Sequence, residues 1–233
     1  MKYKTLLFDV DNTLLDFDAN EAESFHRMIL ELGEVYTEEL YQTYKSLNEE
    51  LWKKIERREI SVEEGVNTRF SALMRLYGRE VDGRQWETVY RRYLNRGTQQ
   101  IPHVHEVLTR LKETHRLYVI TNGMEETQVF RMEASGLSAY FLEMFISGRI
   151  GVGKPSKEYF DYVKAHIPEF DAASTLVIGD SLTSDIKGGY DAGIDTCWFT
   201  RDRGAISADS GNEAAPTYVI HELPELLPLL DKI

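Results

Sequence analysis

Short apolar runs alternate with amphipathic helical stretches through the second half of the chain. From about Val104 onward, apolar residues at helical spacing separate runs of β-branched, aromatic and leucine residues that are too short for helices. The strand-like runs are Leu6–Phe8, Leu117–Ile120, Phe145–Ile146, Leu176–Ile178, Thr196–Phe199 and Tyr218–Ile220. This alternation predicts an α/β fold with a parallel sheet and right-handed crossovers. The functional site of such a sheet is expected at the carboxyl ends of the strands.

Between the first strand-like run and Val104 the pattern is helical instead. Apolar residues recur at helical spacing in four stretches, Phe25–Leu32, Leu40–Leu51, Val66–Tyr77 and Trp86–Tyr93. Asn20 with Glu23, and Ser61 with Glu64, are predicted capping pairs at helix starts. The aromatic stripes of these helices favour the interior of a small bundle over a ligand site.

The position of the helical block predicts the domain organisation. We expect a helical domain over residues 16–97, inserted into an α/β core domain formed by residues 1–15 and 98–233. The stretch from Arg201 to Pro216 is rich in Gly, Ser, Ala and Asp, and predicts a mobile loop.

Composition narrows the class of partner. The net charge of −12 and the isoelectric point of about 5.0 disfavour a nucleic acid polymer or an anionic membrane. The single cysteine, Cys197, precludes an internal disulfide. Neither a signal peptide nor a membrane-spanning run is evident, which predicts a cytoplasmic protein. The oligomeric state does not follow from the sequence.

Carboxylates gather where two strands end. Asp9 and Asp11 follow the first strand-like run, and Asp180 and Asp185 follow the run that begins at Leu176. Like charges that share one site are costly unless a cation compensates them, and a hard ion such as Mg²⁺ prefers oxygen ligands. The alternatives are solvated turn residues for the first pair and a helix N-terminal acid for Asp185.

Two further segments carry groups suited to phosphate. Thr121, Asn122 and Gly123 end the Leu117 strand with a hydroxyl, an amide and exposed backbone N–H groups. Lys154 lies in the small-residue segment Gly151–Pro155 and supplies a compact positive charge. Read alone, the first segment could be a plain strand-to-helix turn, and the second is better explained as a surface loop with a solvated lysine.

Taken in order, Asp-x-Asp-x-Thr, strand-Thr, Gly-Lys-Pro and Gly-Asp-Ser-x-x-x-Asp resemble the motifs of the haloacid dehalogenase (HAD) superfamily of phosphohydrolases. The resemblance implies a Rossmann-like core with an inserted helical cap. It also implies that Asp9 attacks the phosphorus to form an aspartyl-phosphate. Asp11 would protonate the leaving oxygen and then deprotonate the hydrolytic water. The presence of Asp11 argues against the dehalogenase branch, which needs no acid for a halide.

The same resemblance distributes the other roles. It assigns phosphate binding to Thr121, Asn122 and Lys154. It assigns Mg²⁺ to the Asp9 side chain, the Asp11 backbone carbonyl and Asp180, while Asp185 would act through water or through Lys154.

The helical block lies between the first and second motifs, as in family members whose cap closes over a small substrate. Phe17, Asp18 and His26 are candidate lining residues, with ordinary packing or solvation as the alternative. Locally, Gly179–Gly189 and Ala192–Trp198 are similar to bacterial pyrimidine 5′-nucleotidases that remove noncanonical nucleotides. A 5′-nucleotidase acting on pyrimidine nucleoside monophosphates is therefore expected. The alternatives are a sugar-phosphate or phosphoglycolate phosphatase, a phosphomutase and a non-enzymatic binding module.

Overall fold

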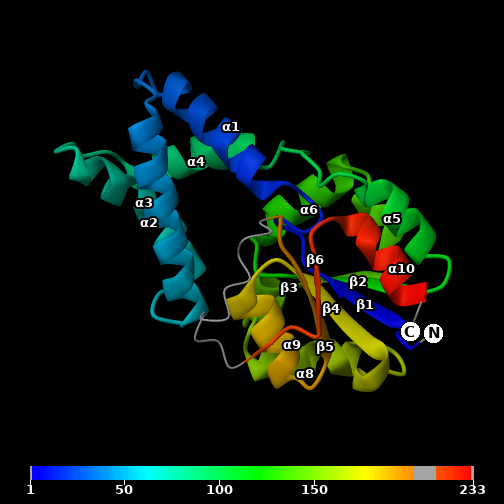
Figure 1. Cartoon of the computed structure of the whole chain (residues 1–233). Coiled ribbons are helices and arrows are strands. Elements are labelled where there is room, and N and C mark those ends of the chain that lie inside the picture. Colours follow the sequence, from blue (N-terminus) through cyan, green and yellow to red (C-terminus); the bar gives the residue numbers. More distant parts are fainter. Residues whose placement is uncertain (1, 202–213, 232–233) are drawn as a thin grey trace. The chain divides into compact units, whose positions relative to one another are not determined.

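The computed structural model describes residues 2–201 and 214–231. The predicted loop from Arg201 to Pro216 falls mainly on residues 202–213, outside the described residues. Six strands form one sheet (Figure 1): β1 (Thr5–Phe8), β2 (Arg116–Thr121), β3 (Glu143–Ile146), β4 (Thr175–Gly179), β5 (Asp195–Phe199) and β6 (Tyr218–Ile220).

The strand order β3-β2-β1-β4-β5-β6 places β1 in the interior of the sheet. All neighbouring strands are parallel, and Leu7 of β1 lies opposite Tyr118 of β2 and Val177 of β4. Parallel strands covered on both faces carry continuous apolar runs, which is the pattern seen in β1 and β4. The predicted Rossmann-like α/β core is confirmed.

Helices cover both faces of this sheet (Figure 1). One face packs against α5 (Val104–Leu111), α6 (Glu125–Ala134) and α10 (Leu226–Asp231), and the other against α8 (Lys157–His166) and α9 (Lys187–Asp191). Shorter turns are α7 (Ser147–Ile150), η1 (Leu137–Tyr140), η2 (Ala172–Ser174), η3 (Leu182–Ile186) and η4 (Leu223–Glu225). Successive side chains of a strand point to opposite faces, so Leu6 and Phe8 pack on one side and Leu7 on the other.

The chain divides into two compact units, one formed by Met1–Phe17 and Thr98–Ile233 and the other by Asp18–Gly97. The second unit, called the helical unit below, contains most of α1 (Phe17–Glu31), and α2 (Glu38–Glu56), α3 (Val62–Leu76) and α4 (Gly83–Leu94). The Ser61 cap is confirmed, since its hydroxyl accepts a hydrogen bond from the Glu64 N–H. The prediction that Asn20 and Glu23 cap a helix start is wrong.

Asn20 lies inside α1, which begins three residues earlier, at Phe17. Its side chain is buried and donates a hydrogen bond of 3.0 Å to the carbonyl oxygen of Leu94 at the end of α4. The close approach leaves no room for a side chain at residue 97, since a Cβ added to Gly97 would lie 1.8 Å from the Asn20 amide oxygen. Asn20 therefore ties α1 to the end of α4.

Aromatic rings fill the interior of the helical unit. The ring of Tyr44 stacks on Phe25 and on Phe70, with centroid distances of 4.6 and 5.4 Å. Tyr90 packs against Phe70 at 5.3 Å, and the guanidinium of Arg69 lies 4.6 Å from the centroid of the Tyr90 ring. These contacts agree with the predicted bundle interior.

Polar groups are buried among these rings and pair with one another. Arg69 donates to both Glu87 and Asn48, and Asn48 in turn donates a 2.8 Å hydrogen bond to Glu21. Tyr44 completes the chain of contacts with a 3.4 Å hydrogen bond to Glu21. Because buried charges are stable only when paired, this network favours a single arrangement of the four helices.

Glu21 is expected to make the stability of the protein pH-dependent. Burial raises the pKa of its carboxyl to about 7, against the opposing charge of Arg69, whereas an ordinary glutamate titrates near about 4.3. The folded state therefore binds more protons, and the unfolding free energy falls as pH rises from about 4 to about 8. Glu21→Gln retains the acceptor oxygen but does not titrate. Its unfolding free energy, relative to that of wild type, should therefore rise by about 2–3 kcal/mol between pH 5 and pH 8.

Urea unfolding at the two pH values measures this gain through fluorescence, because Trp52 and Trp86 belong to the helical unit. Glu63→Gln on the same unit is a matched control, since it makes the same chemical change at an exposed residue and should leave the pH dependence almost unchanged. If wild type and Glu21→Gln differ in unfolding free energy by the same amount at both pH values, the Glu21 charge does not cause the pH dependence.

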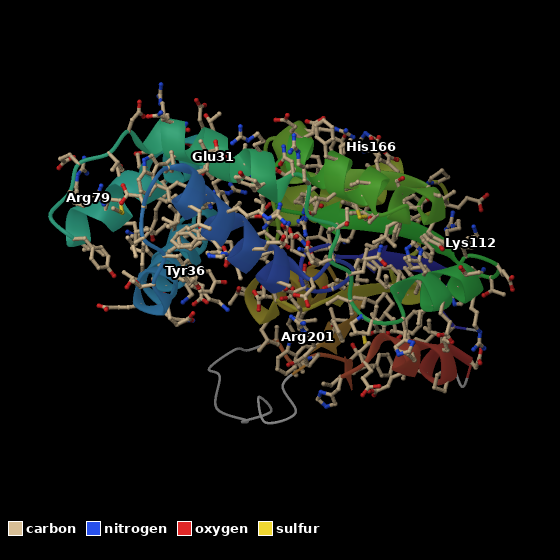
Figure 2. All side chains as sticks on the ribbon, turned by 90° about the horizontal axis from the view of Figure 1, so that it is seen from above. Glu31, Tyr36, Arg79, Lys112, His166 and Arg201 are labelled. Carbon is tan, nitrogen blue, oxygen red and sulfur yellow. The ribbon has the colours of Figure 1, made fainter. Side chains whose placement is uncertain are left out.

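The surface of the helical unit carries ion pairs, one between α1 and α4 and one between the segments that follow α1 and α3. Figure 2 labels Glu31 and Arg79, which pair with Arg92 and Glu34 respectively.

Within the described ranges, no helix combines the length and the apolar character that crossing a membrane requires.

Candidate active site

Lys154 joins the ends of three strands at the centre of the sheet. Its ammonium donates 2.6 Å hydrogen bonds to Oδ1 of Asp9 and to Oδ1 of Asp185, and a 2.9 Å bond to the carbonyl oxygen of Ile120. Asp9 follows β1 and extends its pairing with β4, because its N–H donates to the carbonyl oxygen of Ile178 at 2.9 Å. Lys154 is 3% exposed and Asp9 is 7% exposed. Asp9, the predicted nucleophile, and Lys154, the predicted phosphate-binding cation, are thus in direct contact.

The charges in this cluster shift one another's pKa values. Burial lowers the pKa of Lys154, but the carboxylates of Asp185 and Asp9 outweigh it, so the pKa is raised overall. Burial raises the pKa of Asp9 to about 7, with Lys154 opposing the shift and Asp185 adding to it. Burial, together with the negative charge of Asp9, also raises the pKa of Asp180 well above its ordinary value. Fully ionised, the three acids would carry more negative charge than Lys154 alone offsets.

Asp185 is held from both sides of its carboxylate. Oδ1 accepts from Lys154, and Oδ2 accepts a 3.1 Å hydrogen bond from the Ser181 N–H. A Cβ added to Gly179 would lie 2.2 Å from the same Oδ2, so only glycine fits at the end of β4. Both oxygens of Asp185 are therefore occupied by protein donors.

Asp180 contrasts with Asp185. Its backbone is fixed by a 2.8 Å hydrogen bond from the indole N–H of Trp198 to its carbonyl oxygen. Its carboxylate accepts no side-chain or backbone hydrogen bond from the residues that the structure describes. Carboxylate oxygens of Asp9, Asp180 and Asp185 lie within 4.8 Å of one another. This set of hard oxygen donors fits a cation such as Mg²⁺, and among the described residues Oδ2 of Asp9 and both oxygens of Asp180 accept no hydrogen bond.

Thr121 ends β2 with its hydroxyl turned to the same region. Oγ1 accepts a 3.0 Å hydrogen bond from the Gly123 N–H and a 2.8 Å bond from Nε2 of Gln128. The hydroxyl donates to no described residue, so its proton is available to a bound anion.

Asn122 is engaged with Lys154 rather than directed into open space. Its Oδ1 accepts from the Lys154 N–H and its Nδ2 donates to the Lys154 carbonyl, both at 2.8 Å. A Cβ on Gly153 would lie 2.4 Å from the Asn122 Oδ1, so the glycine permits this approach. The geometry favours positioning of the Lys154 segment over direct contact with phosphate.

Asp11 is bound by two residues that sequence reasoning missed. Oδ1 accepts a 2.5 Å hydrogen bond from Nη1 of Arg131, and Oδ2 accepts a 2.7 Å bond from Nε2 of Gln128. Asn12, next in the chain, adopts a left-handed φ of 59°, which Asn tolerates better than most residues and which reverses the chain after Asp11. The i,i+3 spacing of Gln128 and Arg131 was the only signal, because it puts both on one face of α6.

The three candidate lining residues have ordinary contacts in their own units. The Phe17 ring lies 5.5 Å from the Arg131 guanidinium, measured to the ring centroid. Asp18 pairs with Lys45 at 3.7 Å. His26 is exposed and packs edge-on against Tyr36, with 4.6 Å between centroids.

Residues 6–199 match the family described as haloacid dehalogenase-like hydrolase. The sequence is similar to the HAD-hydrolase YfnB of Bacillus subtilis strain 168, with 44% identity covering 99% of this chain and 96% of that protein. A crystal structure of YfnB, described as bound to magnesium and revealing interdomain movement, superposes with a TM-score of 0.93, covering 99% of this chain and 100% of that one.

Two bacterial nucleotidases also match over 97% or more of their length. Pyrimidine 5′-nucleotidase PynA of Streptococcus pneumoniae is 40% identical, covering 100% of this chain and 97% of that protein. Pyrimidine 5′-nucleotidase YjjG of Escherichia coli K12 is 30% identical, with 100% of each chain covered.

Proposed function

The chain belongs to the haloacid dehalogenase-like hydrolase family, and on that premise we propose that it is a Mg²⁺-dependent phosphatase of small phosphate monoesters. The observation that carries the proposal is the Lys154 bridge between Asp9 and Asp185, beside the unbonded carboxylate of Asp180. A phosphate monoester is an anion, and an anionic nucleophile approaches it only where fixed cations neutralise the field.

Asp9 is the proposed nucleophile. One oxygen, Oδ1, is held by Lys154, which leaves Oδ2 to attack the phosphorus. The new bond between this oxygen and phosphorus forms as the bond from phosphorus to the leaving oxygen breaks. The product of this step is an aspartyl-phosphate and the free alcohol.

Asp11 is the proposed acid and base. It gives its proton to the leaving oxygen in the first step, so the alcohol departs neutral. In the second step a water attacks phosphorus, Asp11 takes the water's proton, and the bond between phosphorus and the Asp9 oxygen breaks. Inorganic phosphate leaves and both carboxyls return to their starting states.

Other side chains hold the transferring group. The Thr121 hydroxyl has a free proton to donate to a phosphoryl oxygen, and Lys154 supplies the charge. We assign Asn122 to the positioning of Lys154, because its amide makes both of its bonds to that residue's backbone. Asp185 likewise acts through Lys154.

Mg²⁺ would be held by the Asp9 and Asp180 side chains and by the Asp11 backbone carbonyl. When bound, it supplies Lewis-acid polarisation of a phosphoryl oxygen and offsets the charge of the acids. The YfnB structure described as bound to magnesium supports this choice of ion.

We propose that the helical unit, Asp18–Gly97, acts as a cap that closes over the substrate and excludes bulk water. Phe17, Asp18 and His26 remain candidate contacts for the part of the substrate beyond the phosphate. The interdomain movement described for YfnB is the behaviour that such a cap needs.

Pyrimidine nucleoside 5′-monophosphates are the proposed substrates, because two full-length relatives, PynA and YjjG, are pyrimidine 5′-nucleotidases. If closure forms stacking and base-edge contacts, kcat/KM should exceed that of a bare sugar phosphate by about tenfold to a hundredfold. Nucleoside 3′-phosphates and polymers should be poor substrates, since the phosphate must reach Asp9.

Steady-state phosphate release from dUMP, dTMP, UMP, AMP, ribose 5-phosphate and phosphoglycolate measures this preference. A rate for ribose 5-phosphate or phosphoglycolate equal to that of the best nucleotide would mean that the base is not read. Turnover that needs a bisphosphate activator and yields no free phosphate would indicate a phosphomutase. Binding without any turnover would indicate a binding module.

A further inference from the structure

A fully buried arginine and glutamine lie behind Asp11. Arg131 and Gln128 of α6 are both 0% exposed. Removing a guanidinium from water costs several kcal/mol unless a partner compensates the charge. Nε and Nη2 of Arg131 have no hydrogen-bond partner within the described part of the chain. The Asp11 carboxylate is the one anionic side chain among the described residues that pairs with this guanidinium.

We propose that Arg131 and Gln128 are positioning residues for Asp11, fixing its carboxyl in the orientation that serves the leaving oxygen. Each oxygen of Asp11 has its own donor, Nη1 of Arg131 at 2.5 Å and Nε2 of Gln128 at 2.7 Å. Two bonds to different oxygens fix both the direction and the rotation of a carboxyl plane. The inference rests on the proposed function, because it takes Asp11 as the acid and base.

The two acids of the first motif therefore have separate cations. Lys154 contacts Asp9 and Asp185, whereas Arg131 contacts Asp11. The side chain of Asp11 is 29% exposed, but that of Arg131 is 1% exposed. One edge of the Asp11 carboxyl thus remains open to a ligand while its anchor stays inside the protein.

Gln128 connects this anchor to the phosphate-binding side of the site. Its Nε2 donates to Asp11 and to Oγ1 of Thr121, and its Oε1 accepts from Arg131 at 3.3 Å. A Cβ added to Gly123 would lie 2.3 Å from the same Nε2, so the absence of a side chain there makes room for the glutamine. A displacement of Arg131 is transmitted to the acid more directly than to the phosphate site.

The test is a comparison of leaving groups. Protonation matters little for p-nitrophenolate and much for the alkoxide of a nucleoside 5′-monophosphate. Arg131→Met should therefore lose at least about tenfold more kcat/KM on dUMP than on p-nitrophenyl phosphate. Arg131→Lys, which keeps the charge, should recover part of the loss on dUMP. In the Asp11→Asn background, Arg131→Met should cause almost no further loss, since it acts through Asp11.

Arg149→Met is the matched control. Arg149 is half-exposed and pairs with Glu125 at the start of α6, the helix that carries Arg131. Its loss should therefore not change the ratio of the two rates. Gln128→Met is a second variant, read by the same ratio, if Arg131→Met does not fold by circular dichroism. Equal losses on both substrates for folded Arg131 and Gln128 variants would overturn the inference while leaving the proposed function intact. Absence of wild-type turnover on either ester would overturn both.

Discussion

Asp9→Asn is expected to lower kcat by at least about 10⁴-fold, because an amide oxygen cannot form the acyl-phosphate bond on which turnover depends. Asn retains the size of the side chain and an oxygen that can accept from Lys154, so the loss should come from chemistry rather than from folding. Steady-state phosphate release from dUMP measures it, with thermal unfolding followed in parallel.

Asp191→Asn is the matched control for this substitution. Asp191 is exposed and pairs with Lys187 at 2.6 Å on α9. Its replacement makes the same chemical change outside the cluster and should leave kcat within about twofold, as is usual for exposed pairs. An Asp9→Asn protein that keeps more than about 1% of wild-type kcat would contradict a covalent role for Asp9.

Removing divalent metal is expected to abolish turnover, with a loss of at least about 10²-fold that added Mg²⁺ reverses. The reason is electrostatic, since Asp9, Asp180 and Asp185 lie together with Lys154 as their only close cation among the described residues. Treatment with a chelator, followed by stepwise return of Mg²⁺, measures the effect.

Binding can also be measured without turnover. A ligand that binds only the folded state stabilises it by about 2.7 kcal/mol at a hundredfold excess over its Kd, so Mg²⁺ should raise the Tm of wild type. Asp180→Asn should reduce this shift, while the exposed Asp191→Asn control should retain it. Full activity in metal-free buffer would contradict a role for Mg²⁺ in turnover. A rise in Tm with Mg²⁺ that is equal in wild type and Asp180→Asn would contradict binding of the ion by Asp180.

The α/β core could be predicted because its physics is local. Strands buried on both faces must be apolar along their whole length, so β1 and β4 are visible as Leu6–Phe8 and Leu176–Ile178. Parallel order then brings the residues after each strand to one edge, which is where Lys154, Asp9 and Asp185 meet. The roles of these residues in catalysis stay predictions.

The contacts that were not predicted depend on tertiary structure. Asn20 is a residue type that often caps helices, yet it lies inside α1, where its side chain donates a hydrogen bond to the Leu94 carbonyl. Arg131 and Gln128 look like the solvated side of a helix, since a sequence pattern does not distinguish a buried charge from an exposed one. Their partner, Asp11, lies far away in sequence and comes close only in the folded chain.

Trapping of the intermediate tests the central claim most directly. Enzyme is mixed with Mg²⁺ and with dUMP that carries a radiolabel in its phosphate, and the reaction is quenched in acid within the first turnover. The peptide that contains Asp9 is then isolated. The account predicts label on this peptide, released by hydroxylamine as expected for an acyl phosphate, and no label in Asp9→Asn. A first turnover that releases phosphate without labelling Asp9, or equal labelling of the Asp9→Asn protein, would contradict it.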